Sequence, residues 1–245
     1  MAGNPLKQNA ILADKNLTGK NLTGNQLKLI ACLAMLADHA AKGFSLRGPA
    51  FIIMSGLIGR IAFPIFCVML AEGFFYTRNR KRYLVRILLL ALASEIPFDL
   101  LFRNTLFYWD HQNTCFTLFL GLLLFLVLEK IRENGQADYR MSAALQILSI
   151  FAFSSAAVLL RTDYDANGIL ALTALYYGWR TKKGTAAITA CLFLNIYQFQ
   201  NLGAFLALIP LSLYSGSRGS RRAAARNLFY IFYPAHLLVL YFLSR

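Results

Sequence analysis

Long apolar runs separated by short polar segments follow one another along nearly the whole chain. Nine of them are candidates for membrane-spanning helices: Leu27–Phe44, Phe51–Tyr76, Tyr83–Phe102, Phe116–Leu128, Ala143–Leu160, Gly168–Trp179, Thr185–Tyr197, Leu202–Tyr214 and Leu228–Leu243. Several are shorter than the roughly 20 residues that a helix perpendicular to the bilayer needs, so we expect tilted helices or a locally thinner bilayer. The pattern predicts an all-α polytopic integral membrane protein with about nine transmembrane helices.

The first 25 residues are polar and depart from this pattern. They contain a duplicated tetrapeptide, Asn16–Gly19 and Asn21–Gly24, but no apolar core and no small-residue cleavage site. A secretory signal peptide would have both of these features. We therefore expect a flexible cytoplasmic segment over residues 1–25, followed by one transmembrane domain over residues 26–245.

Composition and charge support a membrane protein with a cytoplasmic N-terminus. The chain is 58% hydrophobic and only 15% charged, with a mean hydropathy of +0.51, which is not the composition of a soluble domain. If the N-terminus is cytoplasmic, nineteen of the 25 Lys and Arg residues fall on that side, in agreement with the positive-inside rule. We therefore attribute the net charge of +14 to topology and anionic lipid, and we expect no nucleic-acid binding.

One cytoplasmic loop is more basic than topology alone requires. Its basic residues are Arg78, Arg80, Lys81, Arg82 and Arg86. Such a cluster is suited to the phosphates of a nucleotide cofactor. Near the same end of its span, Glu72 is expected to pair with the arginine at position 78, 82 or 86. The four cysteines lie singly in different spans, so we expect neither disulfides nor a metal site.

Ionisable residues inside the apolar runs are the strongest indication of function. His39 and His236, two of the three histidines, lie in the first and last runs, and Arg60 lies in the second. An ionisable side chain in hydrocarbon costs at least about 2.5 kcal/mol, so it is usually retained for a purpose. Glu95 and Asp99 are four residues apart and therefore share a helix face in the third run. Together these residues predict a polar site embedded in the membrane.

A histidine in such a site is suited to act as a general base oriented by a carboxylate. Asp38 adjoins His39, but neighbours on a helix point roughly 100° apart, so Glu95 or Asp99 is the alternative orienting partner. For Arg60, a structural ion pair with Asp38 or Glu95 and a functional role in the polar site are both open.

The predicted outer loops contribute further polar residues. We expect His111 to be solvated, and Asn113 follows in the same loop as a further polar residue. Asp163 and Asp165 precede Gly168 in what reads as an ordered turn, with the glycine allowing a tight entry to the next helix. Binding of an acceptor substrate is the less favoured interpretation for these two aspartates.

Several linked motifs resemble those of the TraX family. They are Leu27–Ala31 leading to Asp38-His39, Gly59–Phe66, Leu70–Phe74, Thr77–Arg80, Ser94–Asp99, Asn113–Leu118 and Tyr233–Leu237, in the same order as in the family. The resemblance extends from about Leu27 to the C-terminus. It implies an acyltransferase-like membrane domain in the bacterial cytoplasmic (inner) membrane, with an acetyltransferase activity associated with pilin.

From the resemblance we expect acetyl-CoA as co-substrate, no metal, and an acceptor such as a pilin-like peptide. His39 becomes the leading catalytic residue, as base or as transient acetyl carrier, with Asp38, Arg60, Glu95 and His236 in support. The basic cluster becomes the site for the CoA phosphates, and Asp99, Asn113 and Asp163 become candidates for binding the acceptor. Two alternatives stay open: an O-acetyltransferase for a surface glycan or small molecule, and a proton-coupled small transporter that uses the same buried groups as a relay.

Overall fold

The computed structural model describes residues 21–135, 138–179, 181–195, 203–219 and 223–245. Within these ranges the chain is helical, with connecting loops and two isolated β-bridges, Leu22 to Tyr214 and Gln112 to Thr162. The prediction of an all-α protein is therefore confirmed for this part of the chain. Most of the predicted N-terminal segment, residues 1–20, lies outside it.

Each of the nine apolar runs overlaps one or more helices of the described structure. In chain order they are α2 (Gly24–Gly43), the stretch from α3 to α4 (Gly48–Tyr76), α5 (Arg80–Arg103), α6 (Thr114–Asn134), α7 (Tyr139–Leu159), α8 (Asp165–Gly178), α9 (Lys183–Asn195), α10 (Gly203–Leu206) with α11 (Leu208–Ser212), and α12 (Ala223–Leu243). The main departure is the eighth run, which is interrupted at Ala207. Tyr197 and Leu202, which bound the seventh and eighth runs, lie outside the described residues.

The second run changes its helical geometry along its length. A short α-helix, α3 (Gly48–Phe51), passes into a π-helical segment, η1 (Ile52–Ile58), then a 3₁₀ turn, η2 (Gly59–Ile61), and finally α4 (Ala62–Tyr76). π-Helical turns are rare and occur frequently at functional sites. In this chain Ser55 lies in the π-helical segment and Arg60 in the 3₁₀ turn, and both belong to the site described below.

Among the described residues, three helical stretches are long and apolar enough to cross a membrane: Gly48–Tyr76, Thr114–Asn134 and Tyr139–Leu159. The last of these, α7, exposes most of its apolar side chains. Only 11% of the residues in its most apolar stretch are buried within the protein. In water this exposure would be costly, whereas in lipid tails it is not. The chain is therefore a membrane protein.

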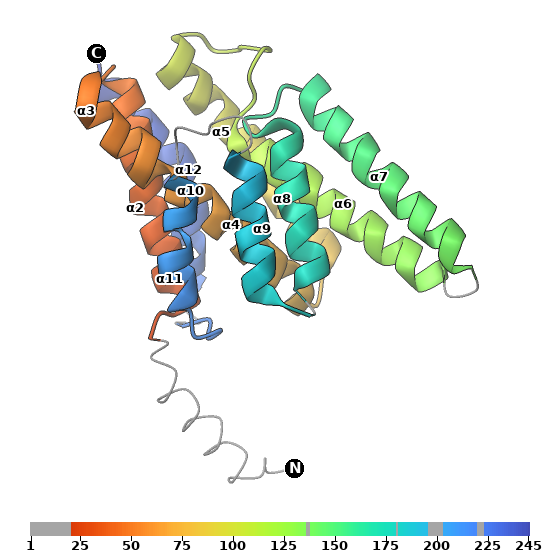
Figure 1. Ribbon diagram of the computed structural model, residues 1–245. Helices are drawn as coiled ribbons and strands as arrows, with labels where there is room; N and C mark the ends of the chain where they lie inside the picture. The colour runs from red at the N-terminus through yellow and green to blue at the C-terminus, as the bar shows by residue number, and fades with distance from the viewer. Residues whose placement is uncertain (1–20, 136–137, 180, 196–202, 220–222) are drawn as a thin grey trace.

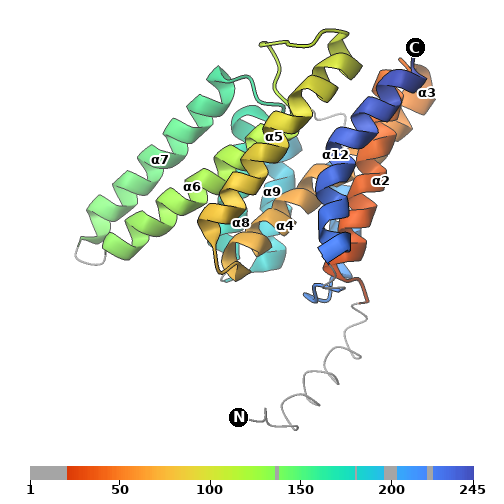
Figure 2. The same ribbon diagram turned by 180° about the vertical axis from the view of Figure 1, so that it is seen from behind.

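Successive helices run up and down the molecule, so the loops gather at two ends (Figures 1 and 2). The C-terminus and the loops 44–47, 104–113 and 160–164 lie at one end, which we call the C-terminal end. The start of α2 and the loop 77–79 lie at the other, which we call the N-terminal end. The last helix, α12, packs against both α2 and α5, so the two ends of the sequence meet in the fold (Figure 2).

Two apolar clusters form the core. The larger one surrounds Phe63, Phe74 and Phe125 and joins α4, α6 and α8. The smaller one joins α2, α5 and α12 through residues such as Met35, Phe98 and Leu237. Both buried histidines lie on the helices that form this smaller cluster.

At the N-terminal end, Glu72 does not pair with an arginine. Its two carboxylate oxygens accept from the Tyr214 hydroxyl at 2.7 Å, and among the described residues it has no ion pair. The predicted pairing with an arginine at 78, 82 or 86 is therefore wrong. The reason is tertiary: the bridge between Leu22 and Tyr214 brings the tyrosine to the end of α4.

Candidate active site

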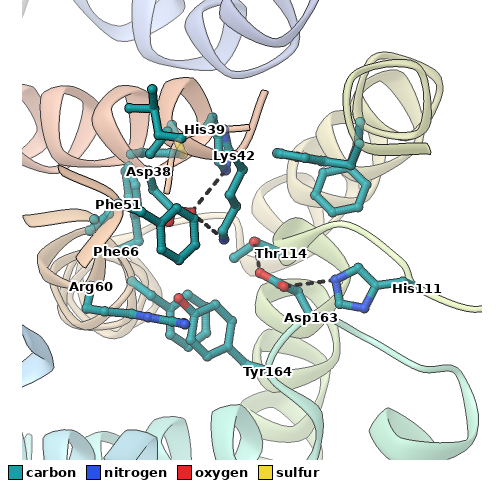
Figure 3. Close-up of a pocket in the computed structure, with 18 of the residues that line it drawn as sticks. Asp38, His39, Lys42, Phe51, Arg60, Phe66, His111, Thr114, Asp163 and Tyr164 are labelled. Atoms are coloured by element: carbon teal, nitrogen blue, oxygen red, sulfur yellow. Dashed lines mark hydrogen bonds and ion pairs between the residues drawn. The ribbon is translucent and has the colours of Figure 1, made fainter. Parts of the chain in front are cut away.

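A cavity of about 420 Å³ lies toward the C-terminal end of the helices. Its walls come from α2, the stretch from α3 to α4, the end of α5, and the loops that precede α6 and α8. Figure 3 shows Asp38 and Lys42 on one side, Arg60 and Tyr164 on another, and Thr114, Asp163 and His111 grouped together. The aromatic rings of Phe51, Phe66, Phe98 and Phe102 complete the lining.

His39 and His236 form a buried pair, although 197 positions separate them in the sequence. Nδ1 of His39 lies 2.8 Å from Nε2 of His236, and each residue is 6% exposed. Their rings are nearly parallel, and the edge of Phe102 packs against His39. His39 lines the cavity and His236 supports it from α12.

The hydrogen bonds of this pair determine which nitrogen of His39 is free. Nδ1 of His236 lies 2.8 Å from the backbone carbonyl of Phe232, which can only accept, so His236 donates there. When His236 is neutral, its Nε2 then carries no proton and accepts from Nδ1–H of His39. Neutral His39 is therefore left with an unprotonated Nε2, on the side of the ring that faces Asp38.

Asp38 lies next to this free nitrogen. Its Oδ2 is 3.9 Å from Nε2 of His39 and 2.7 Å from Nζ of Lys42, and its Oδ1 accepts a short hydrogen bond from Ser55. Gly59 permits this approach, because a Cβ atom at position 59 would lie 2.5 Å from the Cβ of Asp38. The carboxylate is thus fixed from both sides and can stabilise a positive charge on His39.

Arg60 projects into the cavity without a carboxylate partner. Among the described residues it makes no ion pair. It lies beside Tyr164 in the cavity wall, and its Nε is buried without a partner (Figure 3). A structural ion pair with Asp38 or Glu95, one of the two interpretations from the sequence, is therefore wrong, since Lys42 and Asn113 occupy those carboxylates. Arg60 has donor capacity for a negatively charged group in the cavity.

His111, Asp163 and Thr114 form a second polar group at the mouth of the cavity. Nε2 of His111 lies 3.1 Å from Oδ1 of Asp163, and the Thr114 hydroxyl donates to Oδ2. The hydrogen bond to Asp163 raises the pKa of His111 above its usual 6.5. Burial alone would raise the pKa of Asp163, but the hydrogen bonds from His111 and Thr114 and the charge of Lys42 outweigh it and lower that pKa to about 2. The His111 side chain is 36% exposed, as expected of a solvated residue, and it also has a hydrogen-bond partner in Asp163 that the sequence did not predict.

Glu95, Asp99 and Asn113 do not line the cavity among the residues described. Asn113 caps α6 by accepting from the Cys115 backbone, and its amide donates to Glu95; Asp99 accepts from the Tyr108 backbone at 2.7 Å. These contacts brace the loop 104–113. The expectation that Glu95 or Asp99 orients His39 is therefore wrong, because their shared helix face is directed at this loop and His236 takes the orienting position.

The basic cluster lies at the N-terminal end, away from the cavity. Arg78, Lys81 and Arg82 are exposed, whereas Arg80 stacks over Phe74 and lies 3.5 Å from Glu129. Arg86 lies over the ring of Tyr83, and its Nε is buried without a partner. None of these five basic residues is part of the cavity lining that the structure describes.

A family model described as TraX protein matches residues 23–244. The chain belongs to the TraX family. A curated relative, "Probable fimbrial assembly protein FimC, serogroup H1" of Dichelobacter nodosus, is 31% identical over 238 residues, which cover 88% of this chain and 93% of that protein. No solved structure matches the chain.

In this TraX chain, motifs that are far apart in the sequence meet at the cavity. Asp38 and His39 come from the first motif and Arg60 from the second, and all three line the cavity. The last motif supplies His236. In the described part of the chain, no three His, Cys, Asp or Glu residues are grouped as a metal site would require.

Sequence reasoning missed several residues of the site: Lys42, Ser55, Thr114, Tyr164 and, as a member of the cavity, His111. Lys42 had a detectable signal, since it lies four residues after Asp38 and thus on the same helix face. Ser55 and Tyr164 had none, because a hydroxyl in an apolar run or a turn is common and only the tertiary contacts give it a role.

Proposed function

We propose that this TraX protein is a membrane-embedded acetyltransferase that moves an acetyl group from acetyl-CoA to the amine of an exported, pilin-like peptide. The observation that carries the proposal is the unprotonated Nε2 of His39, which the hydrogen bonds through His236 to Phe232 leave free beside the cavity. The name of the fimbrial relative supports a pilin-like acceptor.

In the proposed reaction, acetyl-CoA supplies an acetyl thioester. His39 takes a proton from the neutral amine through Nε2 as the amine nitrogen attacks the thioester carbon. Asp38 stabilises the imidazolium that results. When the C–S bond breaks, His39 returns the proton to the sulfur, which leaves as the free thiol, so that a C–N bond has replaced a C–S bond.

Arg60 is proposed to stabilise the oxyanion of the tetrahedral intermediate. Its buried Nε has no partner in the described structure, and an orphaned donor is available to a developing negative charge without a competing acceptor. Removal of one oxyanion donor typically lowers kcat by about 100- to 1,000-fold. Tyr164 lies beside the guanidinium in the cavity wall.

The basic cluster is proposed to hold the phosphates of CoA. Arg78, Lys81 and Arg82 are exposed and Arg86 has an unpartnered Nε, whereas Arg80 already has Glu129 beside it. From Arg86 to Phe98, which lines the cavity, α5 rises about 18 Å at 1.5 Å per residue. The proposal requires the flexible pantetheine arm to cover this distance while the nucleotide stays at the N-terminal end.

We further infer a multi-pass protein of the bacterial inner membrane, with nine crossings and a cytoplasmic N-terminus. The alternation of the helices between two ends and the positive-inside pattern support this topology. It places the basic cluster on the side of cytoplasmic acetyl-CoA. The cavity then opens toward the side from which an exported peptide approaches.

The hydrogen-bond pattern favours catalysis over proton transport. A proton relay made of side chains needs, at each step, a group that can both accept and release a proton. The pathway from His39 through His236 instead ends at the Phe232 carbonyl, which accepts a hydrogen bond but does not pass a proton on. The proton-coupled transporter is therefore the weaker alternative, and a hydroxyl acceptor remains as the alternative substrate.

The test is release of free CoA thiol from acetyl-CoA by the detergent-purified protein, with and without a peptide amine. We expect amine-stimulated release that falls by at least 100-fold in His39→Gln. His236→Leu, which leaves the Nδ1–H of His39 without an acceptor, should lose most activity, whereas His236→Gln retains an acceptor and should lose less. The control is Asp138→Asn, because asparagine can still cap the N-terminus of α7. Full activity in folded His39→Gln would refute the proposal.

A further inference from the structure

The cavity contains two separate titratable units rather than one. The pair of His39 and His236 lies deep, whereas His111 with Asp163 lies at the mouth, where the His111 side chain is 36% exposed. The proposed transfer uses only the deep pair. The pair of His111 and Asp163 therefore has no role in that transfer as proposed.

Proton balance distinguishes the two acceptor classes. Acetyl transfer to a hydroxyl group moves one proton from oxygen to the leaving sulfur and releases none. An amine arrives mainly as an ammonium ion at neutral pH, and must lose one proton before its nitrogen can attack and a second during the reaction. A site for amines therefore needs an exit for one extra proton, and a site for hydroxyls does not.

His111 has the geometry of an oriented base. Asp163 accepts from its Nε2–H, and Thr114 fixes the second carboxylate oxygen, so the neutral ring is left with an unprotonated Nδ1. The ring stacks on Phe98, another residue of the cavity wall. When Nδ1 gains a proton, the imidazolium faces the carboxylate of Asp163 directly.

We propose that His111 is the outer base of the cavity, which takes the first proton from an acceptor that enters as a primary ammonium ion. This inference rests on the proposed acetyltransferase function and deepens it by naming the acceptor class as an α-amine. In the step, one N–H bond of the ammonium breaks and an Nδ1–H bond of His111 forms. The neutral amine goes on to His39, and His111 releases its proton to water at the mouth.

The charges around His111 are compatible with this role. They are the carboxylates of Asp163, Glu95, Asp99 and Asp165 and the cations of Lys42 and Arg103. The hydrogen bond to Asp163 raises the pKa of His111 above its usual 6.5, which narrows the gap to the roughly 7.7–8.0 of an α-amino group. A lysine amine, at about 10.4, holds its proton more tightly and is the poorer proton donor to His111.

The experiment compares two amines that differ in charge at neutral pH. Alaninamide is largely an ammonium ion, whereas 2,2,2-trifluoroethylamine is largely uncharged because its three fluorine atoms withdraw electrons from nitrogen. In His111→Gln we expect kcat with saturating alaninamide at pH 7 to fall by on the order of 100-fold and to recover toward pH 9. With trifluoroethylamine the same variant should keep its kcat within about twofold of the unmodified protein.

A second variant separates base chemistry from structure. His111→Lys keeps a cation for Asp163 but offers no base at pH 7, so it should fold normally and show the same difference between the two amines. Because the chain has only three histidines, the imidazole signals in an NMR spectrum of histidine-labelled protein are few, and His111 is assigned by its loss in His111→Gln. Without acetyl-CoA, alaninamide should increase the protonation of His111, and glycerol should not.

The outcomes distinguish this inference from the proposed function. If the unmodified protein transfers acetyl groups but both variants lose equal activity with the two amines, the transfer stands and His111 is not a base. If no transfer occurs while alaninamide still protonates His111, the acetyltransferase is wrong and the ammonium site stands. If neither transfer nor protonation occurs, both are wrong.

Discussion

The backbone carbonyl of Phe232 determines which nitrogen of His39 can act as a base. This carbonyl accepts from His236, which therefore accepts from His39, and the free nitrogen of His39 faces Asp38. Each bond also satisfies a polar atom that would otherwise be buried without a partner, at a cost of about 1–3 kcal/mol. At the scale of single residues, the same contacts that stabilise the buried histidines assign their chemistry.

The ion pair of His111 and Asp163 should make stability depend on pH. The pKa of His111 is raised, so its contribution is complete below pH 6.5 and is lost as the pH rises through the pKa of the folded state. The pKa of Asp163 is lowered to about 2, so its contribution is complete above pH 3.8 and is lost as the pH falls toward 2. Both contributions are therefore complete between pH 3.8 and 6.5.

The measurement is the difference in Tm between the unmodified protein and His111→Gln in detergent, from pH 3 to pH 9. We expect the unmodified protein to be more stable by the largest margin near pH 5, with a smaller difference at both extremes. A difference that is constant with pH would show that the pair does not contribute through its charges.

Among the elements, the stretch from α3 to α4 has the largest influence on the site. Its π-helical segment directs Ser55 to Asp38, and its 3₁₀ turn directs Arg60 into the cavity. Close backbone approaches hold it in place: a Cβ at Gly203 of α10 would lie 2.4 Å from the Gly56 carbonyl, and one at Gly59 would collide with Asp38. A regular α-helix here would change the position of both site residues.

Gly59→Ala tests this arrangement. The new methyl group must push η2 away from α2, which we expect to destabilise the protein by about 1–3 kcal/mol and to lower acetyl transfer by displacing Arg60. The matched control is Gly184→Ala in α9, where a Cβ meets nothing within 4 Å. That change should be neutral or stabilising by up to about 1 kcal/mol. Thermal unfolding and CoA release check both, and equal effects of the two would contradict the packing argument.

At the scale of the whole molecule, the proposed topology separates the donor and acceptor ends. It predicts that loop 104–113 faces outward and that the segment between α8 and α9 faces the cytoplasm. The four native cysteines are buried, so an introduced cysteine is the main site for a thiol reagent. Leu106→Cys should react with a membrane-impermeant maleimide in intact cells, and Thr181→Cys only after lysis. The reverse pattern would overturn the proposed orientation.

The sequence by itself determined the helical architecture, because a run of apolar residues in lipid must satisfy its backbone hydrogen bonds internally and therefore forms a helix. It also identified His39, His236 and Arg60, because an ionisable residue in an apolar run is costly and so conspicuous. Only the tertiary structure decided which of these groups meet. The side-chain partners depend on how the helices rotate and cross, and apolar residues on every face give no signal of that rotation.

Glu95 and Asp99 show that the sequence predicts which residues share a helix face but not what that face contacts. Their spacing correctly places them on one face of α5, yet that face is directed at the loop 104–113 rather than at His39. His236 was recognisable as a buried histidine, but its contact with His39 exists only because α12 packs between α2 and α5. The cavity, the polar group at its mouth and the unpartnered Nε of Arg60 arise from the same packing, which brings together residues from both ends of the chain and from the loops between them.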